Sequence, residues 1–361
     1  MTQSNIRFFL PGPTYVLPAV REAMLVDVVG HRSPGFNLLY ESMAPRLQAV
    51  FRTRGDVLVA TGSATLVMES AIISTVESRV LNLVCGAFSE RWHQICLSLG
   101  KQADRVSVPW GRAIDPDLVR EALSRQRYEA VTVVHNETST GVINPLETVA
   151  RVVREESDAL LLVDTVSSMA GAPIETDEWG LDVVLASIQK AMAAPPGLTV
   201  FSLSERAAER ASRLETRGFY TDFLRYRDKH RSGGTITTPA VSVFYALDRQ
   251  LDNIVDEGME ARWRRHEELQ EQTARWVELR AMNWASESGC RSPTISCLQA
   301  PAGTSAPRIV EELAGLGFTV GGGYGKWKPN TFRIGHMGEV RTEDLDGLFA
   351  TLDEVLEADE R

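Results

Sequence analysis

Lysine is scarce in this chain of 361 residues. Only five of its 38 basic residues are lysines, and the others are arginines. The lysines are Lys101, Lys190, Lys229, Lys326 and Lys328. Because an imine with an aldehyde requires a primary amine, very few side chains of this protein can perform that chemistry.

Cysteine and long apolar runs are also sparse. The four cysteines, Cys85, Cys96, Cys290 and Cys297, form no C-x-x-C pair and have apolar neighbours. We therefore expect buried free thiols, without a disulfide framework or a metal site. No apolar run approaches the roughly 20 residues that span a bilayer, and the first seven residues lack the features of a secretory signal. These features predict a cytoplasmic protein.

The acidic character of the chain limits its partners. A net charge of −10 without a basic patch argues against nucleic acid and anionic membranes as partners. The content of 43% hydrophobic and 24% charged residues is ordinary for a globular protein. A chain of this length exceeds the roughly 250–300 residues that one core supports, so two unequal domains are expected.

Short apolar runs alternate with amphipathic, helix-length stretches from Asp56 to about Glu205. This alternation predicts an α/β fold with a mostly parallel, doubly wound sheet. The predicted buried parallel strands are Asp56–Thr61, Val80–Cys85, Arg105–Val108, Ala130–His135, Leu160–Asp164, Val183–Ser187 and Thr199–Ser202. The helices predicted between them include Phe88–Leu99, Pro116–Arg125 and Leu146–Glu155.

The pattern changes after Pro239 to two long helices, Val241–Leu251 and Met259–Arg280. From Thr294 onward, short strands and two helices indicate a smaller α+β domain. The predicted units are an N-terminal arm (1–15), a large domain (16–257) and a small C-terminal domain (258–361).

A lysine directly follows one predicted strand. Val183–Ser187 leads through Ile188 and Gln189 to Lys190, which precedes small residues and a Pro-Pro-Gly turn. Ligands of open α/β sheets bind beyond the carboxyl ends of the strands, and burial there lowers the pKa of an amine and makes it nucleophilic. Lys190 is therefore a candidate Schiff-base residue, with a lysine that merely extends to solvent as the alternative.

Two further strand ends carry polar groups. Asp164 ends a buried strand, where a charged carboxylate requires a partner such as a protonated pyridine nitrogen; a helix N-cap is the alternative. Ser63, Ala64 and Thr65 follow the first strand at the start of a helix, where free amides bind anions. Phe88 follows the second strand and can stack on a planar ring or simply pack in the core. Together, these groups meet the requirements of pyridoxal phosphate.

At this point the sequence resembles the class V aminotransferases of the fold-type I pyridoxal-phosphate enzymes, particularly the alanine/serine–glyoxylate (serine–pyruvate) branch. The resemblance extends over nearly the whole chain. The motifs that carry it are FLPGPTYVLPAVREAM from Phe9, GHRSPGF from Gly30, HNETSTGVINPL from His135, VDTVSSMAG from Val163, SIQKAMAAPPGL from Ser187, TTPAVS from Thr237 and FRIGHMG from Phe332.

The resemblance implies roles for the residues at the strand ends. Lys190 would hold the cofactor covalently, Asp164 would pair with the ring nitrogen, and Phe88 would stack on the ring. Thr138 would lie near the phenolic oxygen of the ring. The phosphate would be bound by Ser63, by the amides of Ala64 and Thr65 and by the side chain of Gln189.

The resemblance also implies how the substrate and a second subunit contribute. Arg333 would bind the substrate carboxylate, for which its planar guanidinium is suited, and Gly12 would lie beside the substrate. Thr237 would reach the phosphate in the neighbouring subunit of a homodimer. Gly234 departs from the family pattern, because relatives often have a tyrosine at this position. Binding of the phosphate by the neighbouring subunit would therefore be weaker.

The predicted activity is transfer of an amino group from alanine or serine to glyoxylate or pyruvate, with ping-pong kinetics. One alternative is a transaminase for an unusual amine, such as an aminophosphonate or pyridoxamine, with His31, Arg32 and the loop 321–325 near the substrate. A second is a lyase or desulfurase, although such relatives stack a histidine on the ring and use a cysteine on a mobile loop. From a different class, the chain could be a nucleotide-binding or a non-catalytic regulatory protein, but neither G-x-G-x-x-G after the first strand nor the Walker spacing is present.

Overall fold

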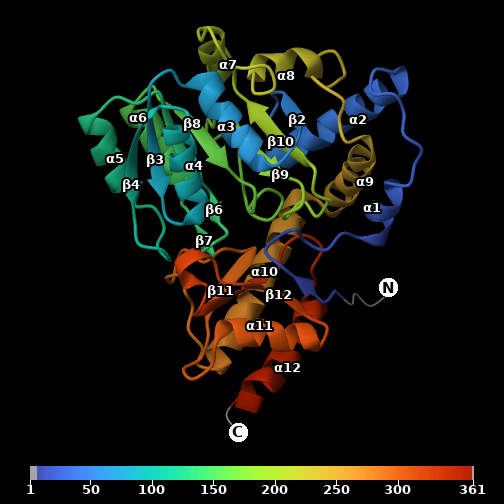
Figure 1. Cartoon of the computed structure of the whole chain (residues 1–361), viewed down its shortest axis with the longest axis vertical. Coiled ribbons are helices and arrows are strands. Elements are labelled where there is room, and N and C mark those ends of the chain that lie inside the picture. The colour runs from blue at the N-terminus through green and yellow to red at the C-terminus, as the bar shows by residue number, and fades with distance from the viewer. Residues whose placement is uncertain (1–5, 360–361) are drawn as a thin grey trace.

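A seven-stranded sheet forms the centre of the larger part of the molecule (Figure 1). The structure is a computed structural model that describes residues 6–359. The strands lie in the order β2-β10-β9-β8-β5-β3-β4. Their bounds are β2 (Val57–Thr61), β3 (Arg79–Val84), β4 (Gln102–Ser107), β5 (Ala130–Val134), β8 (Leu160–Asp164), β9 (Val183–Ser187) and β10 (Leu198–Leu203). All seven predicted strands are present, which confirms the predicted α/β class.

Two details of the strand prediction were wrong. Strand β10 runs antiparallel to both β2 and β9, because the connection Ile188–Gly197 is too short for the crossover that a parallel pair needs. Strand β4 begins three residues before the prediction and is largely exposed. It pairs with β3 at the edge of the sheet, so its polar residues face solvent and give no apolar signal.

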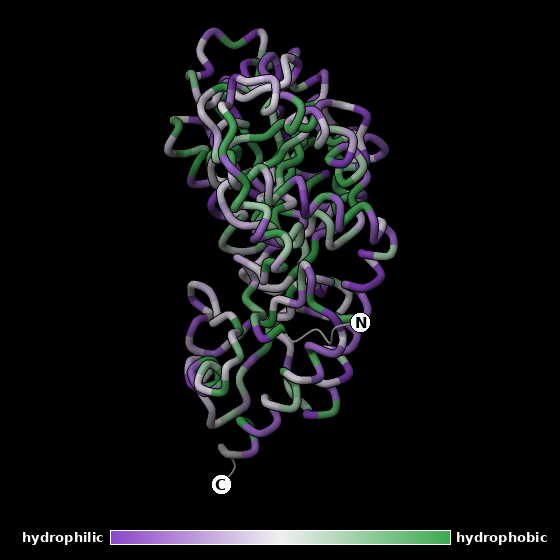
Figure 2. Tube along the Cα trace, turned by 90° about the vertical axis from the view of Figure 1, so that its right-hand side faces the viewer, coloured by the Kyte–Doolittle hydropathy of each residue, from purple (hydrophilic) through white to green (hydrophobic). Residues whose placement is uncertain are grey.

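Helices cover both faces of the sheet. The helices on one face are α3 (Ala64–Thr75), α4 (Ala87–Ser98), α7 (Glu205–Ser212) and α8 (Phe223–His230). Those on the other face are α2 (Pro34–Phe51), α5 (Pro116–Arg125), α6 (Leu146–Glu156) and α9 (Val241–Glu257). Apolar side chains gather on the sheet-facing side of each helix, as in α6, where Leu146, Val149 and Val153 are buried. Hydrophobic segments accordingly run through the interior of the larger part of the molecule (Figure 2).

The segment before the sheet contains structure that the sequence pattern did not predict. Helix α1 (Pro18–Ala23) packs on α9, as does α2. Ser33 begins α2, because its Oγ accepts a hydrogen bond from the amide of Phe36 and Pro34 supplies a helical φ at the first position. A short hairpin of β6 (Asn136–Glu137) and β7 (Val142–Ile143) extends from the end of β5.

A smaller four-stranded sheet lies beside the long helix α10 (Met259–Leu279), which runs from the larger part of the molecule into the smaller one (Figure 1). The other elements are β11 (Ile295–Gln299), α11 (Ala306–Gly315), β12 (Thr319–Gly322), the 3-10 helix η1 (Gly325–Trp327), β13 (Thr331–Gly335) and α12 (Thr342–Asp359). Strand β1 (Phe8–Phe9) pairs with β12 in parallel, so the N-terminal segment joins the C-terminal sheet. The division at residue 258 stays a prediction, and the predicted arm includes residues 1–5, which lie outside the described residues.

Candidate active site

A cavity with a volume of about 210 Å³ lies at the carboxyl ends of the parallel strands. It brings together eight of the predicted site residues from five separate stretches of the chain. The predicted residues that line it are Ser63, Ala64, Thr65, Phe88, Thr138, Asp164, Gln189 and Lys190. Met68, Arg91, Val134, Asn136 and Val166 complete its wall.

Lys190 lies in the turn after β9, and its amine is removed from bulk water. Its Nζ donates a hydrogen bond of 2.5 Å to the carbonyl oxygen of Pro11. Burial lowers the pKa of this amine to about 8, and the positive charges of Arg333 and Arg91 act in the same direction, against the charge of Asp164. A substantial fraction of the amine is therefore neutral near pH 8 and able to attack an aldehyde.

Gly12 lies directly against this lysine. A Cβ atom at position 12 would be only 2.4 Å from Nζ of Lys190, and its φ of +103° favours glycine. The segment is held in place by Thr14, whose Oγ1 donates to the carbonyl oxygen of Lys190 at 3.0 Å. The structure thus places Gly12, which the resemblance assigns to the substrate region, against the proposed reactive amine.

Asp164 is 5% exposed at the end of β8. Its Oδ1 accepts a hydrogen bond of 2.9 Å from the amide of Val166. Burial raises the pKa of this carboxyl to about 7, and the negative charge of Glu137 contributes to the increase. Among residues 6–359, no donor bonds to Oδ2, so one oxygen of this costly buried carboxylate is available to a cationic N–H group in the cavity.

The N-terminus of α3 forms an anion-binding corner of the cavity. The Ser63 side chain does not cap the helix, and the amides of Ala64 and Thr65 have no hydrogen-bond acceptor in the described part of the chain. Arg91 adds a positive charge here: its Nη1 donates to Thr65 Oγ1 at 3.3 Å. Free amides and a guanidinium suit a phosphate group. Sequence reasoning missed Arg91, although it lies one helical turn after Phe88.

Glu137 holds the start of α4, on which Phe88 lies. It is fully buried, and its carboxylate accepts hydrogen bonds from the amides of Phe88 (3.2 Å) and Ser89 (2.9 Å). Ser139 Oγ donates to the same carboxylate at 2.5 Å. The carboxylate thereby satisfies the first amides of the helix and orients Phe88. The sequence analysis did not identify Glu137 either. The one feature that could have indicated it is a single acidic residue in the short run of polar residues after β5.

Arg333 is a nearly buried guanidinium without a carboxylate partner among the described residues. It is 9% exposed on β13, and burial lowers its pKa. Nε donates to the carbonyl oxygen of Gly322 at 2.9 Å and Nη1 to that of Thr138 at 3.2 Å. An arginine has five N–H donors, and a buried charge is costly without a counter-ion, so this site suits an incoming carboxylate.

The structure does not bring Thr237 into the cavity of its own chain. Thr237 is exposed on the loop between α8 and α9. The neighbouring Thr238 contacts His31, with 3.4 Å between Oγ1 and Nε2, and Arg32 is exposed. His31 and Arg32 therefore lie beside the loop that carries Thr237. The loop 321–325, in contrast, borders Arg333.

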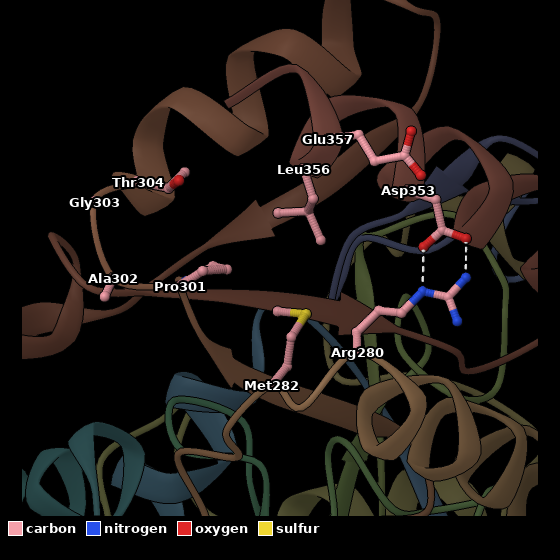
Figure 3. Close-up of a pocket in the computed structure, with 9 residues that line it drawn as sticks. All are labelled: Arg280, Met282, Pro301, Ala302, Gly303, Thr304, Asp353, Leu356 and Glu357. Carbon is pink, nitrogen blue, oxygen red and sulfur yellow. Dashed lines mark hydrogen bonds and ion pairs between the residues drawn. The ribbon is translucent and has the colours of Figure 1, made fainter. Parts of the chain in front are cut away.

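A second cavity, of about 360 Å³, lies in the smaller part of the molecule, between the end of α10, the turn Pro301–Thr304 and α12 (Figure 3). Arg280 and Asp353 face each other there in a closed ion pair. None of the described residues that line this cavity is a lysine or an aromatic residue, which makes the smaller cavity at the sheet edge the better candidate active site.

The residues around the smaller cavity fit pyridoxal phosphate, the cofactor that the resemblance implies. Phe88 offers an aromatic face, Oδ2 of Asp164 an acceptor for the ring nitrogen, and the α3 N-terminus a phosphate site. The amine of Lys190 lies in the same cavity. The ring face, the ring nitrogen, the phosphate and the aldehyde of the cofactor thus each have a partner of suitable chemistry.

Comparison with known proteins gives the same answer. The family model described as aminotransferase class V matches residues 59–304. An uncharacterized aminotransferase of Methanocaldococcus jannaschii is 38% identical over 335 residues, which cover 91% of this chain and 87% of the relative. The serine–glyoxylate aminotransferase of Methylorubrum extorquens is 31% identical over 360 residues, covering 95% and 89% of the two chains. The crystal structure of an alanine–glyoxylate aminotransferase from Nostoc sp. superposes with a TM-score of 0.93 at 32% identity, covering 99% of this chain and 96% of that one. The chain therefore belongs to the class V aminotransferases, is a transaminase and uses pyridoxal phosphate as its cofactor.

Proposed function

We propose that this enzyme moves the amino group of alanine or serine to glyoxylate or pyruvate by a ping-pong mechanism. The observation that carries the proposal is the proximity of a buried, partly neutral amine, Lys190, to a nearly buried guanidinium, Arg333, that has no counter-ion among residues 6–359. The similarity of the chain to a serine–glyoxylate and an alanine–glyoxylate aminotransferase supports serine and alanine as donors and glyoxylate as acceptor.

The cavity residues hold the cofactor in this proposal. Lys190 binds it covalently, Asp164 accepts a hydrogen bond from the ring nitrogen, and Phe88 packs on the ring. Thr138, whose Oγ1 lies 2.6 Å from Ser167 Oγ, faces the phenolic oxygen. The phosphate is bound by Ser63, Ala64, Thr65 and Gln189.

When bound, pyridoxal phosphate supplies an electron-accepting ring that stabilises negative charge at the substrate α-carbon. Arg333 binds the α-carboxylate and so fixes the α-carbon near Lys190. The neutral Nζ of Lys190 then accepts the α-proton as a general base and later returns it, a role suited to a pKa near 8. Gly12 leaves room for this amine.

We further propose a cytoplasmic homodimer in which Thr237 reaches the phosphate of the neighbouring subunit. Thr237 is exposed, and the segment beside its loop exposes Leu25 (82%), Val28 (66%) and Leu38 (68%), an apolar surface of the kind that subunit interfaces cover. The four free, buried cysteines suit a reducing compartment. No described helix has the length and apolar character needed to cross a membrane.

The cysteines also weigh against the desulfurase alternative. Such chemistry needs an accessible thiolate, whereas all four thiols are buried. Burial raises the pKa of Cys85 and of Cys96 to about 12 and that of Cys297 to about 11, and it also raises that of Cys290. Phe88, rather than a histidine, is the aromatic residue among the described residues that line the cavity.

A lysine exchange tests the proposal. Lys190→Ala should abolish borohydride-stable attachment of the cofactor and lower transamination by at least about 10²–10⁴-fold, because the general base is lost. Lys229→Ala, which removes an exposed amine on α8, is the matched control and should retain both properties. Peptide mapping after borohydride reduction identifies the modified lysine. Full activity in Lys190→Ala would contradict the proposed role.

An amino-donor panel tests the substrates. Alanine and serine should discharge the visible absorbance of the bound cofactor and yield keto acids, and glyoxylate or pyruvate should restore that absorbance. Conversion by pyridoxamine or an aminophosphonate alone would instead favour the unusual-amine alternative. Sulfide release from cysteine without a keto acid would favour the desulfurase.

A further inference from the structure

Tyr324 lies where the smaller part of the molecule meets the active site. It follows β12, and its ring centroid is 5.4 Å from that of Phe88. The guanidinium carbon of Arg333 lies 5.5 Å from the centre of the same ring, in cation–π contact. Phe88 lines the active-site cavity, and Arg333 bonds to the backbone of Thr138 in the cavity wall. Tyr324 therefore lies beside both the cofactor-stacking side chain and the proposed carboxylate-binding side chain.

The neighbouring backbone holds Tyr324 in this position. A Cβ atom at Gly323 would lie only 2.6 Å from the carbonyl oxygens of Trp327 and Thr331. Because this distance is too short for a Cβ contact, only glycine fits at position 323. After Tyr324, the ring of Trp327 packs edge-on against Trp110 of the larger part of the molecule, with 5.5 Å between centroids. Gly323 thus fixes the backbone directly before Tyr324, whereas the ring contact of Trp327 is with Trp110.

We propose that the ring of Tyr324 closes the space for the substrate side chain next to Arg333 and thereby restricts the enzyme to amino acids with small side chains. The inference deepens the proposed function and rests on carboxylate binding at Arg333. When Arg333 holds the α-carboxylate, the α-carbon and its substituent lie close to the guanidinium that Tyr324 covers. A longer side chain must displace the ring from both Phe88 and Arg333, whereas a methyl or hydroxymethyl group need not.

The test compares donors of different size. The full-length, cofactor-loaded enzyme is assayed for kcat/KM with alanine, serine and leucine at a fixed keto acid, and single-turnover loss of the cofactor absorbance is followed in parallel. Tyr324→Ala should raise the leucine-to-alanine ratio of kcat/KM at least about 10-fold, which is the discrimination expected of a few methylene groups in a pocket. Tyr324→Phe should keep the wild-type ratio, because the ring remains.

Trp327→Ala is the matched control, since it weakens the same segment without removing the ring beside Arg333. An unchanged ratio in Tyr324→Ala, or an equal rise in Trp327→Ala, would overturn the inference while leaving the proposed function intact. Wild-type enzyme that accepts neither alanine nor serine would overturn the proposed function as well. If Tyr324→Ala fails to fold, Tyr324→Val, which retains apolar packing on Phe88, carries the same expectation.

Discussion

Two buried arginines of this enzyme have opposite surroundings. Arg262 on α10 is fully buried and pairs with two carboxylates, at 2.7 Å from Glu257 and 2.9 Å from Glu339. It also donates to the carbonyl oxygens of Ala170, Ala191 and Gly338. Arg333 is almost as buried but bonds to only two carbonyl oxygens, and no described carboxylate pairs with it.

We interpret this difference as one between an arginine that completes the fold and one whose charge is left for the proposed substrate. Arg262 joins the turn after Lys190, through Ala191, to the smaller part of the molecule, through Gly338 and Glu339. Its charge is neutralised within the protein, and the guanidiniums of Arg265 and Arg262 help lower the pKa of Glu257 to about 2 despite partial burial. The charge of Arg333 has no carboxylate partner in the described part of the chain, which is the arrangement expected for substrate binding.

The largest expected effect is the loss of stability in Arg262→Met. Removal of one partner leaves Glu339 as a buried, poorly compensated charge, so the free energy of unfolding should fall by about 3–5 kcal/mol. Chemical unfolding of wild-type and variant protein under identical cofactor saturation measures the difference. A change below about 1 kcal/mol, the range of an exposed ion pair, would mean that the network contributes little.

Arg333→Met should affect catalysis and leave stability nearly unchanged. Loss of charge-assisted hydrogen bonds to the substrate carboxylate is expected to cost about 2–3 kcal/mol, or roughly 10²-fold in kcat/KM for alanine. Steady-state kinetics and thermal unfolding provide the two measurements. An amine substrate without a carboxylate is the control and should lose much less. Equal losses of kcat/KM for both substrates would contradict the proposal that Arg333, unlike Arg262, binds the substrate carboxylate.

The smallest expected effect concerns the pH at which Lys190 reacts. Because the pKa of its amine is lowered to about 8, the rate of covalent attachment of pyridoxal phosphate to cofactor-free protein should rise with pH, with a midpoint near 8. The positive charge of Arg333 disfavours the protonated amine, so Arg333→Met should move this midpoint upward, toward the ordinary lysine value. Stopped-flow absorbance gives the profile.

Lys229→Ala, which removes an exposed positive charge on α8, serves as the control for the pH profile, because Lys229 is not among the charges that act on Lys190. Its midpoint should match that of wild-type protein. A midpoint near the ordinary lysine value in wild-type enzyme would show that the amine is solvated, and it would remove the physical basis for the reactivity of Lys190.

The fold class and much of the candidate site were predictable from local patterns. Short apolar runs and amphipathic stretches place each strand and helix by their own periodicity, and a parallel sheet gathers the strand ends at one edge. Lys190, Asp164 and the segment Ser63–Thr65 follow such ends, so their proximity depends on elements that the sequence reveals. Phe88 comes after the end of another strand and was predicted in the same way.

Other features depended on contacts between segments far apart in the chain. The pairing of β1 with β12 and the contacts of Tyr324 with Phe88 and Arg333 have no local signal. The sequence by itself determined which elements form and which edge of the sheet carries the chemistry, because apolar periodicity is a property of each segment. Only the tertiary structure decided that Arg262 is neutralised and Arg333 is not, because a buried charge depends on partners that packing brings from elsewhere in the chain.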